Sequence, residues 1–285
     1  MRIDLHTHTT ASDGTDSPAQ LVAAAVAAGL DVLAVTDHDT TRGWAQALDE
    51  RPEGLTIVPG AEFSCVYHGP DGRRVGLHLL GYLFDPGARA LRTERARLRA
   101  SRLVRAEEIV QRLVADDFGI TWEQVGVLAD GATVGRPHIA RALVASGVVP
   151  DVSTAFTELL SSRGPYYVRK EDTDVFDAIG LITAAGGLPV FAHPIARRRG
   201  PVGGDDVVAA MAAAGLVGLE VDHPDHDADD RERAAGLARD LGLIGTGSSD
   251  YHGTNKTTGL GACTTEPAAY ERLLALPAAR APVGP

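Results

Sequence analysis

The sequence is poor in cysteine and has no long hydrophobic run. Cys65 and Cys263 are the only two cysteines among 285 residues, which excludes a disulfide framework and a Cys-x-x-Cys motif. We expect both to be reduced, buried thiols in a cytoplasmic protein. No apolar stretch of about 18 residues is free of charge, so we expect no membrane span. The first strand is predicted directly after Met1, which argues against a signal peptide.

Basic charge is also scarce. The chain has 27 Lys and Arg against 38 Asp and Glu, a formal net charge of −11. This balance argues against a broad nucleic-acid-binding face. It does not exclude a phosphate substrate, because bound divalent cations would outweigh the carboxylates that hold them. With 44% hydrophobic residues, the chain can bury a large core, and its length suits one large domain or a barrel with an insertion.

Histidine, by contrast, gathers where the predicted strands end. Residues 4–13 read DLHTHTTASD, with His6 and His8 two positions apart directly after a short apolar run. Side chains at i and i+2 of a strand point to the same face, so two imidazoles would leave it side by side, as two ligands of one metal would. Asp13 follows after a short turn as a third ligand. Alone, the pattern would also fit surface histidines near an N-terminus.

The pattern recurs at or near the ends of later apolar runs, which adds His38, Glu62, His78, His193, Asp250 and His252. A predicted hairpin over residues 63–81 brings His78 back toward the others. The C-terminal strand ends of a parallel α/β barrel line its active site. A single histidine of this kind is more often a hydrogen-bonded core residue. Six histidines and three carboxylates at successive strand ends instead predict a metal cluster.

The chain contains two kinds of sequence. Residues 1–91 and 171–285 alternate strand and helix patterns, and we expect a barrel that ends in a loose tail over residues 267–285. Residues 92–170 read as a helical insertion that caps the barrel. Its first part carries arginines at helical spacing, namely Arg92, Arg95, Arg97, Arg99, Arg102 and Arg105. They form either a solvated helix face or a basic wall over the site that meets a second phosphate or an RNA backbone.

These segments resemble the PHP (polymerase and histidinol phosphatase) superfamily. The matching stretches are DLHTHTTASDGTDSP, VTDHDT, PGAEFS, HLLGY, GRPHIA, FAHP and GSSDYH, which run from residue 4 to residue 252. The resemblance implies an α/β fold, a distorted (β/α)7 barrel with a helical insertion over the active site. The aspartate at position 13 and the GRPHIA segment most resemble the sequences of one branch, which includes nucleoside 3′,5′-bisphosphate phosphatases and 5′→3′ exoribonucleases. Histidinol phosphatases usually place a histidine near position 13.

The resemblance also implies how the ligands divide among three metals. The first metal would take His6, His8, Glu62 and Asp250; the second Glu62, His78 and His193; the third Asp13, His38 and His252. Imidazole and carboxylate ligands suit Mn, Fe or Zn, and we expect two or three divalent ions, manganese first. Asp37 would steady a ligand imidazole from outside the ligand set; an ordinary surface aspartate is the other interpretation.

Substrate contacts follow from the same resemblance. Arg136 and His138 are similar to the family's phosphate-binding pair, and an arginine fork suits a phosphate; the alternative is a loop arginine beside a helix-capping histidine. The family usually has an arginine one residue before Arg197, which leaves Arg197, Arg198 and Arg199 open as a further phosphate contact. His68 and His223 have no assigned role, and we expect His226 in a solvated loop.

The predicted function is a metal-dependent phosphoesterase, a phosphoric ester hydrolase. Metal-bound hydroxide would attack the phosphorus of a nucleotide monoester (a 3′,5′-bisphosphonucleotide or an AMP-like molecule) or of a short RNA 5′ end. No stable protein partner is inferred. One alternative is a histidinol-phosphate or other small-molecule phosphatase. Another is an amidohydrolase, but many of those need a carbamylated lysine at a strand end, and neither Lys170 nor Lys256 follows a strand. A third is a non-catalytic metal module associated with a polymerase.

Overall fold

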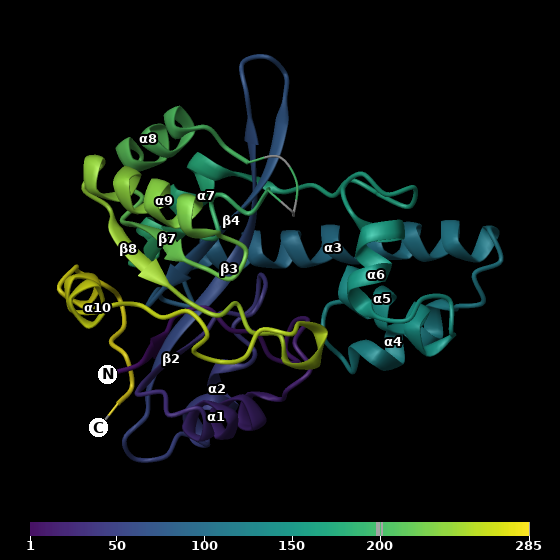
Figure 1. The fold of residues 1–285 in the computed structure, drawn as a ribbon, viewed down its shortest axis with the longest axis horizontal. Helices are drawn as coiled ribbons and strands as arrows, with labels where there is room; N and C mark the ends of the chain where they lie inside the picture. Colours follow the sequence, from purple (N-terminus) through teal and green to yellow (C-terminus); the bar gives the residue numbers. More distant parts are fainter. Residues whose placement is uncertain (198–199, 201, 285) are drawn as a thin grey trace.

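Eight strands form one sheet that curves almost into a barrel (Figure 1). The computed structural model describes residues 1–197, 200 and 202–284. Along the sheet the order is β1 (Ile3–Asp4), β2 (Val32–Val35), β3 (Thr56–His68), β4 (Arg74–Tyr82), β6 (Leu188–Phe191), β7 (Gly218–Asp222) and β8 (Ile244–Gly247). The short β5 (Thr173–Asp174) pairs with β3 outside this order.

The strand directions explain why the barrel is distorted. Strands β1, β2 and β3 are parallel, as are β6, β7 and β8, but β4 runs antiparallel to both of its neighbours. The segments after β1 and β8 meet in a parallel bridge between Thr7 and Tyr251, where the His8 N–H donates to the Tyr251 carbonyl at 2.9 Å. The predicted distorted barrel is therefore confirmed, and its closing segments carry predicted ligands.

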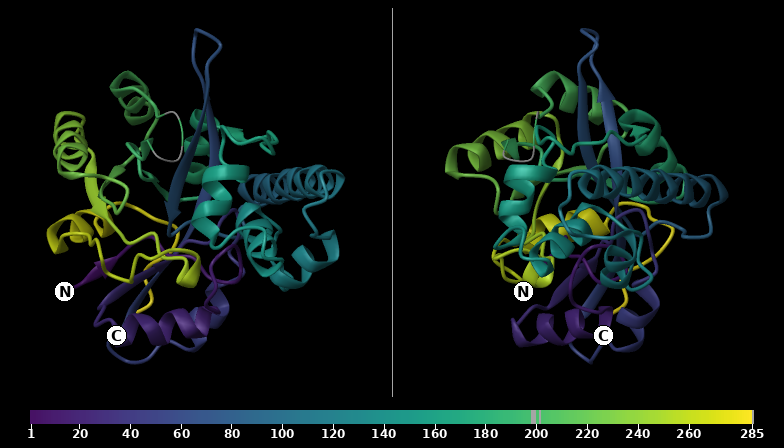
Figure 2. Two further views of the ribbon diagram at one scale, coloured as in Figure 1. Left: turned by 45° about the vertical axis from the view of Figure 1, so that its right-hand side comes forward. Right: turned by 90° about the vertical axis from the view of Figure 1, so that its right-hand side faces the viewer.

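Helices pack around the sheet (Figures 1 and 2). They are α1 (Pro18–Ala27), α2 (Trp44–Asp49), α7 (Val175–Ala184), α8 (Asp205–Ala213), α9 (Ala228–Asp240) and α10 (Pro267–Leu274). Helix α1 begins as the sequence predicts, because Ser17 and Gln20 form a capping box and Pro18 occupies the first turn. Apolar side chains of the strands and these helices, such as Leu33 and Ile179, form the main core.

The insertion projects to one side of the barrel (Figure 2). It contains α3 (Arg89–Ala115), α4 (Trp122–Ala129), α5 (Arg136–Ala145), α6 (Val152–Ala155) and a π-helical turn (Phe156–Leu160). A separate apolar cluster, which runs from Ala106 to Val168, holds these elements together. Helix α3 crosses the expected boundary at residue 92 without a break, so one long helix joins both parts. The division into barrel and cap stays a prediction.

The C-terminal segment is not the loose tail that the sequence suggested. Pro267 starts α10, and Tyr270 and Leu273 bury one face of it against the barrel. Ile57 and Val283 then exchange backbone hydrogen bonds of 2.8 and 2.9 Å. Tyr270 and Leu273 are three positions apart, so they lie on one helix face. This apolar face orders the segment although its composition is rich in Ala and Pro. Among the described helices, none combines the length and the apolar character that a bilayer crossing needs.

Asp4 ties the first strand to the loop after the last. Its Oδ1 accepts the Ser249 N–H at 3.0 Å, and its Oδ2 accepts the Gly261 N–H at 2.9 Å. We expect Asp4→Ala to lower the free energy of unfolding by at least about 2 kcal/mol, because buried donors lose their acceptor. Urea denaturation measures this. Asp49→Ala, at the exposed end of α2, is the matched control and should change little. Equal effects of the two variants would contradict the assigned role of Asp4.

Candidate metal centre

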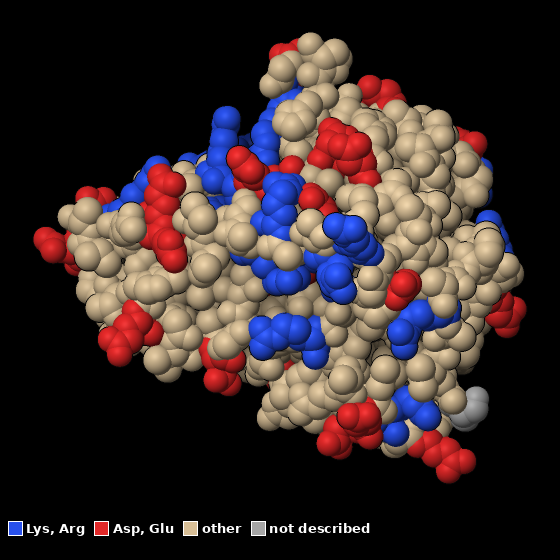
Figure 3. Space-filling view, turned by 180° about the vertical axis from the view of Figure 1, so that it is seen from behind, with Lys and Arg blue, Asp and Glu red and all other residues tan. Residues whose placement is uncertain are grey.

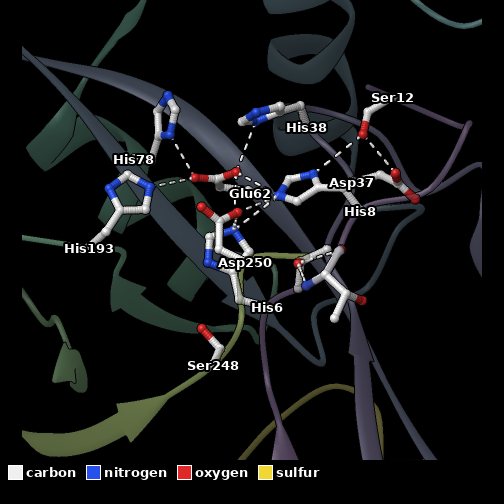
Figure 4. A network of polar contacts seen from close by, with 12 residues as sticks. His6, His8, Ser12, Asp37, His38, Glu62, His78, His193, Ser248 and Asp250 are labelled. Atoms are coloured by element: carbon white, nitrogen blue, oxygen red, sulfur yellow. Dashed lines mark hydrogen bonds and ion pairs between the residues drawn. The ribbon is translucent and has the colours of Figure 1, made fainter. Parts of the chain in front are cut away.

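Glu62, in the middle of β3, lies at the centre of the predicted site (Figure 4). Its side chain is 1% exposed. Its carboxylate oxygens lie 2.6 to 3.2 Å from ring nitrogens of His6, His8, His38, His78 and His193. These imidazoles come from the ends of β1, β2 and β6 and from within β4. The Glu62 carboxylate on β3 therefore contacts side chains from four other strands.

Asp250 follows β8 and approaches the same imidazoles from the other side. Its Oδ1 lies 3.5 Å from Nε2 of both His6 and His8 and 3.4 Å from Nδ1 of His252. Its Oδ2 accepts a hydrogen bond from Lys256 Nζ at 2.6 Å. Asp250 and His193 both have positive φ angles, 50° and 33°. Such backbone strain in non-glycine residues clusters at functional sites.

Asp13 is the third carboxylate. Its Oδ1 lies 3.6 Å from Nδ1 of His8 and from Nε2 of His252, and its Oδ2 lies 3.5 Å from Nε2 of His38. Among the described residues, these four form one of three groups whose ligand atoms lie close enough to hold an ion; the other two are His6, His8 and Asp250, and His38, Glu62 and His78. Eight of the nine predicted ligands thus fall in these groups, and the ninth, His193, lies beside them with its Nε2 3.0 Å from Glu62. His8 and His38 each present ring nitrogens to two groups, which the predicted division did not include.

The ring nitrogens fit a cation better than they fit one another. Nε2 of His6 and Nε2 of His8 face each other at 3.1 Å, and a single proton at most can lie between them. The buried Nδ1 of His38 makes no hydrogen bond although it lies 3.1 Å from Glu62. Ligands about 2.1 Å from one metal lie roughly 3 Å apart. The geometry and the mixed N/O donor set therefore fit divalent transition metals.

Burial and charge act in opposite directions on these groups. Burial lowers the pKa of His8, but the carboxylates of Asp250 and Glu62 outweigh it and raise that pKa to about 9. Burial lowers the pKa of His38 to about 3. Burial also disfavours the Glu62 carboxylate, yet the charges of the imidazoles, His38 first, hold its pKa well below the usual range. A metal ion at His8 must therefore displace a proton.

Glu220 in β7 is a residue that sequence reasoning missed. It is 1% exposed; its Oε1 lies 3.2 Å from Nδ1 of His6 and its Oε2 accepts the His193 N–H at 2.7 Å. It also contacts the Ser248 hydroxyl. With Nδ1–H of His6 donating to Glu220, Nε2 is left for the metal centre. An acidic residue inside the apolar run 217–221 was the available signal.

Two further histidines also differ from expectation. The prediction that His226 lies in a solvated loop is wrong: it is 3% exposed, and its Nδ1 and Nε2 contact the Val221 carbonyl and the Ile195 N–H at 2.9 and 3.3 Å. His223, without an assigned role, places Nε2 3.3 Å from Oδ2 of Asp250. Both rings are hydrogen-bonded in the interior because the loop after β7 folds inward over the site.

Asp37 is buried, so the interpretation as a surface aspartate is wrong. It accepts hydrogen bonds from the Thr9 N–H and hydroxyl, both at 2.8 Å, and from the Ser12 hydroxyl at 2.7 Å. Ser12 Oγ in turn lies 3.4 Å from Nδ1 of His8. Asp37 therefore holds the turn that carries Asp13 and reaches the ligand imidazole only through Ser12.

The expected substrate residues occupy different surroundings. Arg136 is the first residue of α5; its Nη1 donates to the Leu160 carbonyl at 2.9 Å. His138 caps that helix, with its Nδ1 accepting the Gly135 N–H at 3.1 Å. Arg197 is 54% exposed and pairs with Asp230 at 2.5 Å. Its contact with a phosphate stays a prediction, and the alternatives Arg198 and Arg199 lie outside the described residues.

A small cavity joins the metal centre to the insertion. Ser12, Asp13 and His38 line it on the barrel side, and Arg102, Thr133 and Gly135 line it on the insertion side. On the face opposite to that of Figure 1, Lys and Arg side chains gather toward the middle of an acidic molecule (Figure 3). Within the cavity itself, Arg102 is the basic residue beside Asp13 and His38, and its charge favours an anionic substrate.

Comparisons with known proteins agree with this geometry. The PHP domain family matches residues 4–115. A 3′,5′-nucleoside bisphosphate phosphatase of Chromobacterium violaceum is 34% identical over 252 residues, which cover 88% of this chain and 87% of that protein. The chain belongs to the PHP family. A 5′-3′ exoribonuclease of Haemophilus influenzae is 34% identical over 88% of this chain and 90% of its own length. A phosphoribosyl 1,2-cyclic phosphate 1,2-diphosphodiesterase of Eggerthella lenta is 37% identical over 88% and 94%.

Solved structures show the same fold over nearly the whole chain. A candidate metal-dependent phosphoesterase of Bifidobacterium adolescentis superposes with a TM-score of 0.90 at 37% identity, over 96% of this chain and 95% of that one. A Chromobacterium violaceum protein described as an amidohydrolase, with bound sulfate and no metal, gives 0.85 at 32% identity over 96% of both chains. The predicted PHP fold and the class of metal-dependent phosphoesterase are therefore confirmed.

The three groups predict how metal content responds to substitution. Wild-type protein loaded with Mn²⁺ should bind up to three ions, one for each group. Glu62→Ala should lose more metal than Asp13→Ala, because Glu62 contacts imidazoles throughout the centre and Asp13 contacts only one group. Elemental analysis of the folded proteins measures this, with the exposed Glu53→Ala as control. At most one ion in the wild type, or equal metal content in all variants, would contradict the multinuclear centre.

Glu220 gives a second test of the centre. Glu220→Gln should weaken Mn²⁺ binding by about 10- to 100-fold, because the amide orients the His6 ring less well. Competition with a chelating dye measures the affinity. Glu232→Gln, on the exposed face of α9, should leave it unchanged. Unaltered metal binding in Glu220→Gln would limit Glu220 to a role in packing.

Proposed function

We propose that this PHP phosphoesterase hydrolyses a phosphate monoester of a nucleotide, with a 3′,5′-bisphosphonucleotide as the preferred substrate and short RNA 5′ ends as the next. The observation that carries the proposal is the position of the cavity. Ligand side chains Asp13 and His38 form one wall, and Arg102 with Gly135, next to the α5 N-terminus, forms the other. With a metal ion bound at Asp13 and His38, a phosphate at this position would meet positive charge on both sides. The bisphosphate phosphatase and exoribonuclease relatives support this substrate class.

The nine predicted ligands would hold two or three ions, manganese first. Such ions, when bound, neutralise phosphate charge and lower the pKa of a coordinated water. The chain itself supplies orientation. Glu220 and Ser12 contact the imidazoles of His6 and His8 from behind. Arg136, held by the Leu160 carbonyl, is placed to meet an anion that enters from the insertion side.

The lysines argue against amidohydrolase chemistry. A carbamylated lysine that bridges metals needs a free amine among the ligands. Lys256 instead donates to Oδ2 of Asp250 at 2.6 Å, and Lys170 forms an ion pair with Asp172. The predicted ligand set is also complete, with most of its side chains buried, which disfavours a non-catalytic metal module.

A substrate panel tests the proposal. Product formation, followed by chromatography of substrate and product, should be fastest from adenosine 3′,5′-bisphosphate, slower from AMP and from a 5′-phosphorylated dinucleotide, and slowest for ring opening of a five-membered cyclic phosphodiester. Mn²⁺ should support the reaction and a chelator should abolish it. Glu62→Ala is the inactive control. A higher kcat/KM for the cyclic diester, or phosphate release that persists in chelator, would contradict the proposed monoesterase.

A further inference from the structure

Three arginines on one face of α3 contact the segment that follows β2. Arg95, Arg99 and Arg102 are four and three residues apart, so they share a helix face. Arg95 Nη1 donates to Thr41 Oγ1 at 2.9 Å, and Arg99 Nη1 donates to the Asp39 carbonyl at 2.7 Å. Arg102 donates to Asp39 Oδ2 from Nε at 3.1 Å and from Nη2 at 2.9 Å. The insertion helix therefore holds one short segment of the barrel.

Asp39 has a backbone conformation that its surroundings must maintain. Its φ angle is 54°, in the left-handed region that non-glycine residues rarely adopt, and it is 0% exposed. Its N–H donates to the Glu62 carbonyl at 2.9 Å, and its Oδ1 accepts the Ser64 N–H at 2.9 Å. Ser64 Oγ donates to Asp39 Oδ2 at 3.1 Å and accepts from Arg102 Nη2 at 2.6 Å. Such strain persists where several contacts fix it, and it clusters at functional sites.

The residue before Asp39 is the predicted ligand His38, which belongs to two of the three candidate groups. Its Nδ1 lies 3.1 Å from Oε2 of Glu62, and its Nε2 lies 3.5 Å from Oδ2 of Asp13. One ring faces both carboxylates only if the backbone directs it between them. Because β3 fixes Asp39 on one side and α3 fixes it on the other, these contacts also set the direction of His38.

We propose that Asp39 is a positioning residue for the metal centre and that Arg102 of the insertion holds it in place. This inference rests on the metal centre of the proposed function, and it concerns the binding of metal, not of substrate. The Arg102 fork supplies two charge-assisted hydrogen bonds to one carboxylate. The insertion therefore acts on His38 through the residue next to it. Without the fork, the His38 ring is no longer held toward Glu62 and Asp13.

Asp39→Asn separates this role from a general structural one. Asparagine also adopts the left-handed conformation, but it lacks the charge that pairs with the Arg102 guanidinium. In competition with a chelating dye, the affinity of the Mn²⁺ sites that include His38 should fall by about 10- to 100-fold. One tightly bound ion should remain, because one of the three groups does not include His38. A general structural defect would weaken all sites together.

Two further variants keep this test decisive. Asp39→Asn/Arg102→Met removes both charges, so no buried charge is left without a partner, and its Tm without metal should exceed that of Asp39→Asn. Its Mn²⁺ affinity should still be low, because the fork is missing. Asp117→Asn is the matched control: Asp117 is an exposed aspartate with a φ angle of 58°, and its replacement should change neither affinity nor Tm.

The remaining outcomes overturn separate claims. Wild-type affinity at every site in Asp39→Asn, or recovery of both Tm and affinity in the double variant, would show that Asp39 only stabilises the fold. His38→Ala that keeps every ion would refute His38 as a ligand, and with it this part of the proposed metal centre. Loss of metal in His38→Ala without loss in Asp39→Asn would refute the positioning role alone. Since these measurements use no substrate, a failed substrate panel would refute the proposed substrate and leave this result standing.

Discussion

The structure depends on one buried carboxylate. Glu62 lies within hydrogen-bond distance of five imidazoles from four strand segments, and in the protein interior its charge is stable only because those imidazoles surround it. The antiparallel direction of β4 serves this arrangement, because it brings His78 opposite Ser64, two residues from Glu62. A barrel of parallel strands alone would deliver ligands only from strand ends.

The ligands are held by a second set of buried polar residues. Glu220 supports His6 and the backbone of His193, Asp37 supports the turn before Asp13, and Asp4 supports the loop before Asp250. Each is a carboxylate whose oxygens accept backbone or hydroxyl hydrogens. His193 and Asp250 have positive φ angles. Such strained conformations are maintained where several surrounding hydrogen bonds fix the backbone. The same hydrogen bonds therefore stabilise the fold near the centre and position the predicted ligands.

The insertion brings further side chains to the edge of the metal centre, among them Arg102 and Gly135. Barrel ligands alone form a centre that suits many phosphate esters. Helix α3 extends from the barrel into a separate apolar cluster, and it places Arg102 near Gly135 at the α5 N-terminus. Of the predicted alternatives for the arginines of α3, the solvated face holds for Arg92 but not for Arg95, Arg102 and Arg105, which are buried. The basic wall that meets a phosphate stays a prediction.

The sequence by itself determined the family and the barrel and predicted which residues gather around Glu62, because strand periodicity places His6 and His8 on one face and the predicted ligand motifs are local in the chain. Only the tertiary structure decided the rest. Glu220 and His226 gained their roles from neighbours more than twenty residues away, and Arg197 was drawn to Asp230. The contact of Arg102 with Asp39 depends on how α3 packs against the barrel. Burial and distant pairing are properties of packing, and local spacing does not encode them.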